Sequence, residues 1–290
     1  MSASHAVIIP HYNDADRLMR CLRALAPAGL EGAEVIVVDN GSTQSLDAIR
    51  AAFPNVAFVT EPNKGAANAR NRGVRETTAE RLVFLDADCV PQADWFAAIR
   101  RETVRADIIG GAIDVFDETP PPRSGAEAFE TVFAFNYKDY IEKKGFSVTA
   151  NLVTSRSVFL DVGDFIDGLS EDAEWCLRAG TKGYRVALDE TIRVAHPTRS
   201  DWAALVRKWR RITAEMYGLH MNGRGRGAGA LGWAARALVM ALSSLPHLPR
   251  LLFSPRLDTL GERLRGAAVL IRLRLLRSYW MLRQAFGFGI

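Results

Sequence analysis

The chain has 290 residues, 48% of them hydrophobic and 24% charged, which is the composition of an ordinary folded protein with a full hydrophobic core. Its net charge of +4 conceals a division: residues 2–198 carry 21 Lys and Arg against 29 Asp and Glu, whereas residues 199–290 carry 16 against 4. The three cysteines lack CxxC spacing, and no basic segment followed by a long apolar run opens the sequence. These features argue against a disulfide framework or a zinc site, and they predict a cytoplasmic protein without a signal peptide.

Apolar stretches of strand length alternate with helical stretches through the first hundred residues. This alternation predicts an α/β fold with a mostly parallel sheet that has helices on both faces. In such sheets, ligands bind at the carboxyl ends of the strands. The predicted strands are Ala6–Ile9, Glu34–Val38, Val56–Val59 and Leu82–Leu85, and the predicted helices are Asp14–Ala26, Leu46–Ala52, Ala66–Glu76 and one after Pro91.

Polar residues follow three of these strands at their carboxyl ends: Pro10–Asn13, Asp39–Ser42 and Asp86–Asp88. Turn formation accounts for Asn, Gly and Ser at each place taken singly. It accounts less well for three polar clusters at one edge of a sheet. The convergence therefore predicts a ligand site at that edge.

Two acids separated by one residue end the Leu82–Leu85 strand. If the chain stays extended, the carboxylates of Asp86 and Asp88 lie on one side, roughly 6 to 7 Å apart. Their repulsion is then on the order of 2 to 3 kcal/mol at an effective dielectric of about 20. A divalent cation with oxygen ligands removes this repulsion and keeps positions free for phosphate oxygens. In the alternative, one Asp caps the helix after Pro91 and the other lies in solvent; the triplet alone does not decide between them.

Two further segments precede the basic tail. Asp114–Gly145, with a Pro triplet and several aromatic residues, is predicted to be a long loop with a helix, either a surface insertion or a loop on the acceptor side of a site. Ser170 fits the N-cap of a helix whose positive first turn holds Glu171 and Asp172. Capping alone accounts for this acidic pair as well as a functional role does.

Five motifs, in this order and spacing, resemble the family 2 glycosyltransferases: IIPHYND, VVDNGST, EPNKGAANARNRG, FLDADC and LSEDAEWCLRAGTKGYR. The resemblance covers roughly Ala6–His196, about two-thirds of the chain. It implies a GT-A fold, which is a nucleotide-sugar-binding α/β sandwich, and a glycosyltransferase activity. It also favours the cation interpretation of Asp86 and Asp88.

The resemblance implies roles for several residues on the donor side. Pro10 and Tyr12 are expected along the nucleoside, with Tyr12 as an aromatic edge. Asp39 is expected to accept a hydrogen bond from the base, which favours uridine because its ring N–H is a donor. Arg70 is expected near the nucleotide, where a fixed guanidinium is suitable, with an ion pair on the helix surface as the alternative.

The resemblance also implies a metal and a base. Asp86 is expected to contact the ribose or the metal, and Asp88 to ligate a Mn²⁺ or Mg²⁺ ion that neutralises charge on the departing nucleoside diphosphate. His196 corresponds to a further metal ligand in many relatives, and imidazole suits Mn²⁺ better than Mg²⁺, although a lone histidine is often structural. Asp172 is expected to be the general base of an inverting reaction, and Glu171 to orient the acceptor or its loop.

The basic region departs from the sandwich pattern. Ser200–Tyr217 is predicted to be a helix with one apolar stripe and arginines beside it, and Leu260–Phe286 again mixes Leu and Ile with arginines. Trp233–Phe253 is apolar, but Arg236 and two prolines interrupt it too often for a membrane span to be expected.

These patterns predict helices that lie on an anionic membrane surface, where each arginine contributes about 1 kcal/mol. The alternatives are packing on the catalytic domain or on a second subunit, and nucleic-acid binding. The interleaved apolar residues, without a recognisable binding module, argue against nucleic acid. The prediction is a GT-A catalytic domain over residues 1–198 and a membrane-facing helical region over 199–290, at the inner face of the cytoplasmic membrane.

The QxxRW signature of processive family members is absent, because Leu205–Trp209, LVRKW, lacks both Gln and Arg at the required places. Transfer of a single sugar to a hydroxyl of a glycan or lipid-linked acceptor is therefore expected. One alternative is a non-catalytic nucleotide-sugar-binding or scaffold protein, against which the intact acidic motifs argue. The other is a nucleotidyltransferase, which needs a glycine-rich phosphate loop where this chain has PHYNDADR.

Overall fold

The computed structural model describes residues 3–26, 30, 32–101, 103–223 and 225–290. The chain divides into two compact units. The first consists of Met1–Asp114, Asn136–Asp167 and Glu171–His196, and the second of Val115–Phe135, Gly168–Ser170 and Pro197–Ile290. The functional roles assigned above to residues 1–198 and 199–290 stay predictions.

The first unit is built on a sheet with the strand order β3-β2-β1-β4-β7-β6-β8-β5. The neighbouring strands from β3 to β4 are parallel to one another. Beyond them, β7 is antiparallel to β4 and to β6, and the short β5 is antiparallel to β8. The strands span β1 His5–His11, β2 Ala33–Asp39, β3 Ala57–Thr60, β4 Arg81–Leu85, β5 Val90–Pro91, β6 Ile108–Phe116, β7 Asn151–Ser155 and β8 Val186–Pro197.

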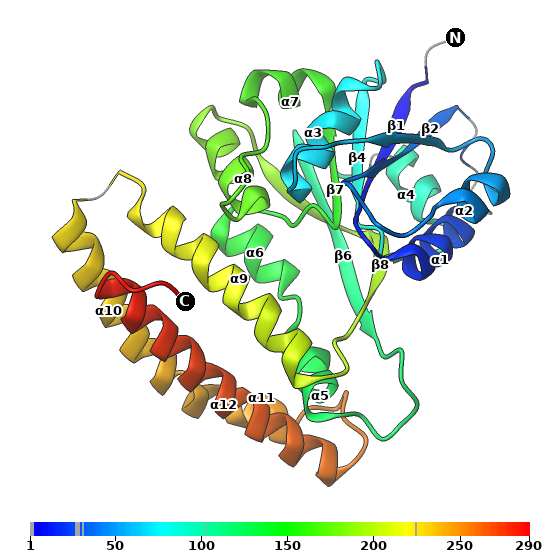
Figure 1. The fold of residues 1–290 in the computed structure, drawn as a ribbon. Coiled ribbons are helices and arrows are strands. Elements are labelled where there is room, and N and C mark those ends of the chain that lie inside the picture. The colour runs from blue at the N-terminus through cyan, green and yellow to red at the C-terminus, as the bar shows by residue number, and fades with distance from the viewer. Residues whose placement is uncertain (1–2, 27–29, 31, 102, 224) are drawn as a thin grey trace. The chain divides into compact units, whose positions relative to one another are not determined.

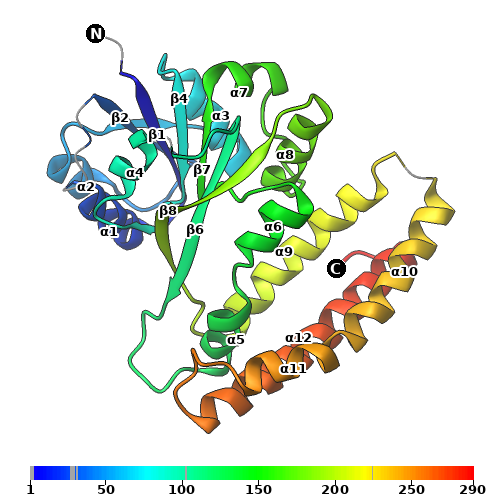
Figure 2. The same ribbon diagram turned by 180° about the vertical axis from the view of Figure 1, so that it is seen from behind.

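Helices cover both faces of this sheet (Figures 1 and 2). On one face, α3, α7 and α8 pack against alternate strand residues such as Ile8 and Phe84. The intervening residues face the other side, where the ring of His5 contacts that of Phe96 of α4, with centroids 5.3 Å apart. The helices of this unit span α1 Ala15–Leu25, α2 Asp47–Ala52, α3 Ala66–Arg75, α4 Trp95–Arg101, α6 Tyr137–Lys144, α7 Arg156–Val162 and α8 Glu171–Thr181.

Burial of both faces explains why the strands are continuous apolar runs in the sequence. The predicted α/β fold is confirmed, and the predicted strands and helices of the first hundred residues occur with bounds shifted by a few residues. Strand β1 runs on to His11, so part of the polar cluster expected after this strand forms its last residues.

The segment Asp114–Gly145 contains the helices α5, Gly125–Phe133, and α6, where the sequence predicted a loop with one helix. A capping box begins α5: the Ser124 hydroxyl accepts from the Glu127 N–H, and the Glu127 carboxylate accepts from the Ser124 N–H. These bonds satisfy backbone donors that the first turn of a helix leaves open. Short-range capping therefore defines a helix inside the predicted loop.

The second unit is helical. Helices α10 and α12 lie side by side, and α12 also packs against α5 and α9 (Figure 1). One apolar core joins residues of α5, α9, α11 and α12, and a smaller one joins α10 to α12 through Trp233 and Met281. The C-terminal helices span α9 Trp202–Met221, α10 Arg226–Leu242, α11 Ser244–Leu252 and α12 Leu260–Ala285.

Within the described residues, one stretch, Arg226–Leu252, is long and apolar enough to cross a membrane. It contains α10 and α11, and most of its residues are not buried in the structure. The stretch therefore meets the length and composition criteria for a membrane span despite the arginine and prolines noted in the sequence.

Part of the positive charge of residues 199–290 is used inside the second unit. Glu130 of α5 is 1% exposed and lies 2.6 Å from Lys208 Nζ and 3.2 Å from Arg199 Nη1. Burial alone would raise the pKa of Glu130, but these two cations lower it below its ordinary value. Arg277 is also buried and lies over the ring of Trp209, 4.1 Å from its centroid. The arginines of this region are thus not all available to an external surface.

Candidate active site

The polar residues at the ends of β1 and β2 form one hydrogen-bonded cluster. The parallel register pairs His11 with Asp39, and His11 Nδ1 lies 3.2 Å from Asp39 Oδ1. The Asp14 N–H donates to His11 Nε2 at 3.1 Å, so the ring proton belongs on Nδ1 and is donated toward Asp39. The Ser42 N–H donates to the same carboxylate at 3.3 Å. The expected convergence of the first two strand ends is therefore present, and His11, which the sequence did not single out, orients Asp39.

Asn40 ties the end of β2 to the loop that leads into α3. Its amide nitrogen donates to the carbonyl oxygens of Glu61 at 3.0 Å and Asn63 at 2.7 Å, and its amide oxygen accepts the Gly65 N–H at 2.7 Å. Because the side chain is buried and both its amide donors and its oxygen are engaged, it positions this loop rather than a ligand. The sequence showed Asn40 only as a turn residue.

Arg70 links two of the acidic motifs. It lies on α3, is 4% exposed, and donates from Nη2 to Asp86 Oδ1 at 2.6 Å and from Nη1 to Glu171 Oε1 at 2.9 Å. Burial alone would lower the pKa of Arg70, but the two carboxylates raise it above its ordinary value. The ion pair left open by the sequence is present. It is buried, however, and joins α3 to the end of β4 and the start of α8, which needs the forked donors of arginine.

Asp86 and Asp88 have different partners. The chain leaves the extended form after β4, where the Cys89 N–H donates to the Asp86 carbonyl oxygen at 3.0 Å and closes a turn. The extended geometry assumed for the two carboxylates is therefore wrong. Asp86 pairs with Arg70, whereas Asp88 Oδ2 lies 3.1 Å from His196 Nε2. The Arg70 guanidinium thus compensates the charge of Asp86, one of the two carboxylates whose repulsion was expected to require a metal ion.

The pair of Asp88 and His196 fits a divalent metal. His196 lies near the end of β8 and is largely buried, and Asp88 is partly exposed. A carboxylate oxygen and an imidazole nitrogen are donors that Mn²⁺ accepts readily. No cluster of three or more His, Cys, Asp and Glu side chains suited to an ion occurs in the described part of the chain. Asp88 and His196 are thus two adjacent donors, and an ion bound by them alone would keep positions for the oxygens of a diphosphate.

Asp172 lies in the first turn of α8, next to Glu171. Burial raises the pKa of Asp172 to about 6, and the Glu171 carboxylate adds to this effect. Its Oδ1 accepts the Ala173 N–H at 2.7 Å, while part of the residue stays accessible to solvent. A carboxylate with a pKa near neutrality, in a residue that solvent reaches in part, has the properties of a general base.

The remaining residues expected on the donor side lie on β1 or directly after it. Pro10 is partly buried within the strand, and Tyr12, which follows its last residue, is 54% exposed. An aromatic ring with an open face provides a stacking surface.

The sequence matches the model of glycosyl transferase family 2 over residues 6–163. Glycosyltransferase AglE of Haloferax volcanii is 30% identical over 216 residues, which cover 71% of this chain and 70% of that protein. The pre-mycofactocin glycosyltransferase of Mycobacterium tuberculosis is 28% identical over 212 residues, which cover 68% of this chain and 44% of the relative. The match thus spans less than half of the mycobacterial protein.

Two solved structures share the fold. The mannosyltransferase PcManGT from Pyrobaculum calidifontis, in complex with GDP-Man and Mn²⁺, has a TM-score of 0.59 and 17% identity, and the match covers 95% of this chain and 88% of that chain. GalNAc-T7 with UDP, GalNAc and Mn²⁺ has a TM-score of 0.50 and 17% identity, with 69% and 45% covered. At this identity the likeness shows the GT-A fold alone.

Proposed function

Since this chain belongs to glycosyl transferase family 2, we propose that it moves one sugar from a UDP-linked donor to a hydroxyl of a glycan or lipid-linked acceptor, with inversion at the anomeric carbon. The observation that carries this function is the Arg70 bridge. One guanidinium holds Asp86, on the donor side, and Glu171, the neighbour of Asp172. A donor phosphate and an acceptor hydroxyl can therefore meet between the two acidic motifs.

On the donor side, Asp39 accepts a hydrogen bond from the base. Uracil presents one ring N–H to a carboxylate, and guanine presents two N–H groups on one edge. The two fold relatives hold GDP-Man and UDP respectively. Uridine is favoured here because His11 and the Ser42 N–H already occupy the Asp39 carboxylate, which leaves little capacity for a second N–H from the base.

Asp88 and His196 hold the divalent metal, and Mn²⁺ is preferred to Mg²⁺ because one ligand is an imidazole. When bound, the ion supplies Lewis-acid stabilisation of the negative charge on the leaving nucleoside diphosphate. Asp172 takes the proton of the acceptor hydroxyl as its oxygen attacks the anomeric carbon opposite the diphosphate. The bond from that carbon to the diphosphate oxygen breaks, and the configuration inverts. Glu171, held by Arg70, keeps the first turn of α8 in place.

Release of nucleoside diphosphate tests this function. UDP-sugars and GDP-sugars should be compared with Mn²⁺ and a membrane lipid extract, and turnover is expected with a UDP-sugar. Turnover with GDP-sugars but not with UDP-sugars would show that the nucleoside of the donor is guanosine and not uridine. Transfer that is absent while nucleotide still binds would favour a non-catalytic nucleotide-sugar-binding protein.

Binding can be measured apart from turnover. UDP should raise the melting temperature only when Mn²⁺ is present, and Asp88→Asn should abolish this rise. A UDP effect that persists in EDTA, or in the Asp88→Asn variant, would reject Asp88 as a metal ligand.

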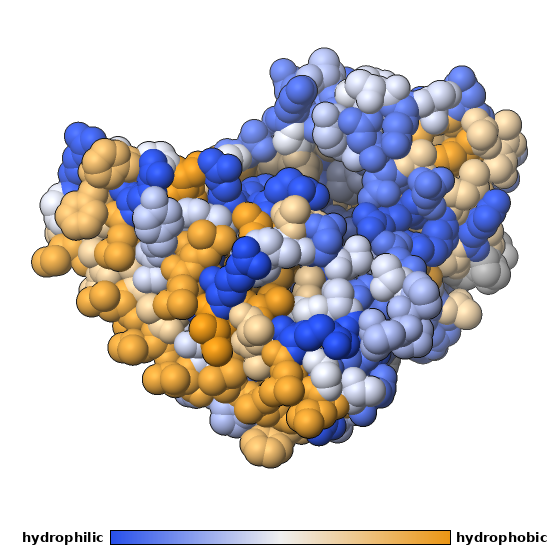
Figure 3. All heavy atoms as spheres, turned by 60° about the horizontal axis from the view of Figure 1, so that its bottom comes forward, coloured by the Kyte–Doolittle hydropathy of each residue, from blue (hydrophilic) through white to orange (hydrophobic). Residues whose placement is uncertain are grey.

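We also propose that the second unit attaches to an anionic membrane surface. Its C-terminal helices expose large apolar side chains, and Figure 3 shows apolar surface over much of this face with hydrophilic residues among it. Arg236 and Arg250 belong to the same helices. An apolar face interleaved with arginines suits the boundary between acyl chains and anionic headgroups. The large exposed apolar residues of α10, α11 and the turn that follows are Leu231, Leu238, Val239, Leu242, Leu245 and Phe253.

Cosedimentation with vesicles that contain phosphatidylglycerol tests the membrane surface. Leu238→Glu/Leu242→Glu should lower the bound fraction, and Leu160→Glu/Leu177→Glu, which alters exposed leucines of the first unit, should not. Equal binding by all three proteins would contradict a membrane role for this face. A dimer that the first variant alone disrupts, seen by analytical ultracentrifugation, would assign the face to a second copy of the chain.

A further inference from the structure

Asn151 is the first residue of β7, and its side chain is completely buried. The register of β4 and β7 places it opposite Leu85, the residue before Asp86, so it lies beside the strand end that leads to the candidate active site. A buried carboxamide needs partners for its oxygen and for both of its amide protons, because each group left without one is costly. The partners of Asn151 therefore show which elements it holds together.

The Asn151 carboxamide joins two strands and one helix to β7. Its nitrogen donates to the carbonyl oxygens of Ala112 on β6 at 3.0 Å and Ile192 on β8 at 2.9 Å, and its oxygen accepts from the indole N–H of Trp95 on α4 at 3.0 Å. Gly111 provides the space, since an added Cβ would lie 2.1 Å from Asn151 Nδ2 and 2.3 Å from the Ile192 oxygen. The side chain is thus fully used within the protein and has a fixed place between these elements.

These bonds close a ring around the pairing of β5 with β8. The Trp95 backbone N–H donates to the Gln92 carbonyl oxygen at 2.9 Å, and the Gln92 N–H donates to the Arg193 carbonyl oxygen at 3.1 Å. Arg193 follows Ile192, whose carbonyl oxygen accepts from Asn151, so the path returns to the carboxamide. Because β5 has only two residues, the ring supplies contacts that its short ladder lacks.

The register of β5 and β8 determines the distance between the two candidate metal ligands. Val90 pairs with Ala195. Asp88 lies two residues before Val90 and His196 lies directly after Ala195, and the two side chains approach to 3.1 Å. A slip of β5 by one residue would move Asp88 by about 3.3 Å along β8. The ligands of a metal site must be held within about 0.5 Å, so the register is critical.

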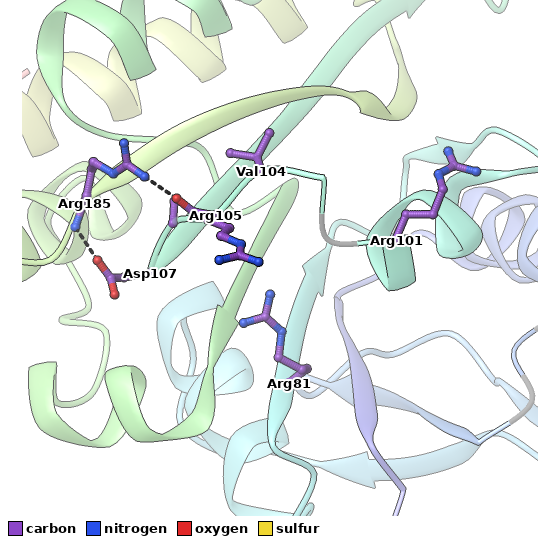
Figure 4. Close-up of a pocket in the computed structure, with 7 residues that line it drawn as sticks. Arg81, Arg101, Val104, Arg105, Asp107 and Arg185 are labelled. Carbon is purple, nitrogen blue, oxygen red and sulfur yellow. Dashed lines mark hydrogen bonds between the residues drawn. The ribbon is translucent and has the colours of Figure 1, made fainter.

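The other end of β8 is held by separate contacts (Figure 4). Asp107 Oδ2 accepts the Arg185 backbone N–H at 2.8 Å, and the Arg185 guanidinium donates to the Arg105 carbonyl oxygen. Arg185 directly precedes β8, whereas His196 lies near the end of that strand. Loss of the Asn151 ring should therefore affect the His196 end of β8 while its beginning stays in place.

With Asp88 and His196 as the metal ligands of the proposed function, on which this inference rests, we propose that Asn151 is a positioning residue for the metal. Its carboxamide holds the two ligands at the separation that one ion can bridge. Groups that orient metal ligands from outside typically change metal affinity 10- to 100-fold. Loss of the carboxamide should therefore weaken metal binding although both ligands remain.

The Mn²⁺ requirement of the full chain tests this role. At a fixed excess of UDP, the Mn²⁺ concentration that gives half of the maximal rise in melting temperature is measured. Asn151→Ala removes all three side-chain hydrogen bonds and should raise this concentration at least about tenfold. Trp95→Phe removes only the bond to the carboxamide oxygen and should raise it about threefold.

Two matched controls make the same changes elsewhere in the first unit. Asn71→Ala removes a buried carboxamide that exchanges two hydrogen bonds with the Phe165 backbone. Trp175→Phe removes one indole N–H bond, to the Gly163 carbonyl oxygen at 2.8 Å, from a completely buried ring. These bonds hold the segment before α8. Each control should lower the melting temperature of the free chain and leave the half-saturating Mn²⁺ concentration within about twofold.

A structural role alone predicts a lower melting temperature without a change in the Mn²⁺ requirement. The positioning role is overturned if Asn151→Ala and Trp95→Phe need no more Mn²⁺ than the unaltered chain, or if the controls need equally more. If Asn151→Ala does not fold, Trp95→Phe against Trp175→Phe decides. If the unaltered chain shows no Mn²⁺-dependent rise, the metal site of the proposed function is rejected, and the role of Asn151 with it.

Discussion

Asp172→Asn separates the chemistry of the general base from the structure of α8. Asparagine keeps the shape of the side chain, and its oxygen can still accept the Ala173 N–H that Asp172 accepts at 2.7 Å. The negative charge is what disappears. We expect nucleotide binding with Mn²⁺ to stay within about twofold and transfer to fall by about a hundredfold or more, which is the usual contribution of a general base.

The same substitution should stabilise the fold. Burial raises the pKa of Asp172 from 3.8 to about 6, which corresponds to about 3 kcal/mol against the charged form in the folded protein. Loss of a negative charge from the first turn of a helix costs up to about 1 kcal/mol. The variant should therefore gain about 2 kcal/mol in the free energy of unfolding at pH 7.

The pH dependence follows from the direction of the shift. A raised pKa means that the folded state binds the proton more tightly than the unfolded state, so the penalty is fully present above pH 6 and is lost as the pH falls toward 3.8. Urea denaturation at pH 7 and pH 4 measures it: the advantage of Asp172→Asn should shrink at pH 4. Transfer by the unaltered chain should fall as the pH drops through 6, because the base becomes protonated.

Glu174→Gln is the matched control, since Glu174 lies in the same turn and pairs with Arg178 at 2.8 Å. It should lose a few tenths of a kcal/mol, as pairs four residues apart on a helix do. A variant Asp172→Asn that is less stable than the unaltered chain at pH 7, or equally advantaged at both pH values, would refute the buried-charge reasoning. Normal turnover would place the base elsewhere.

Arg70→Met should destabilise the fold by about 3 kcal/mol in urea denaturation, because it leaves two carboxylates without their shared cation; a loss below about 1 kcal/mol would show that the bridge is not a buried interaction. Gly65→Ala should cost about 1 to 3 kcal/mol because the residue has φ +127° and an added Cβ lies 2.1 Å from Asp167 Oδ1, whereas Gly180→Ala, with no atom within 4 Å, should be neutral or stabilising by less than about 1 kcal/mol. Glu130→Ala should lower the free energy of unfolding by about 3 kcal/mol and should be worse than either single loss of its cationic partners, since two partly buried cations then remain without their shared carboxylate. If Glu130→Ala lowered the free energy of unfolding by less than about 0.5 kcal/mol, as substitutions at exposed sites do, the burial of Glu130 would be contradicted.

The early strands could be predicted because both faces of the sheet are covered, so each strand is an apolar run that ends where the polar residues begin. Asp39 and Asp86 could be identified from the sequence because each is the first polar residue after such an apolar run. The Arg70 bridge could not be predicted in the same way, since its partners lie 16 and 101 residues away and only the packing of α3 brings them together.

Other differences arise from local geometry that composition does not specify. The turn closed by Cys89 redirects Asp88 toward His196, and no spacing rule distinguishes that turn from two more residues of strand. Helix α5 lies within a segment that was predicted to be mainly loop because of its prolines. The capping box of Ser124 and Glu127 that begins the helix spans only four residues and was not recognised in the sequence. The role of His11 depends on which ring nitrogen is bonded to which neighbour, which only the folded chain determines.

The pairing of Glu130 with Arg199 and Lys208 changes how the C-terminal region can be studied. Helix α5 precedes that region in the sequence, yet the carboxylate of its Glu130 is paired with two cations from residues 199–290. The last ninety or so residues therefore cannot be removed without changing the surroundings of α5. A shortened chain that ends near residue 198 would keep the acid and lose its counter-ions. Poor solubility of such a fragment would report on the apolar face of α5 that the C-terminal helices otherwise cover, and would say nothing about attachment to lipid.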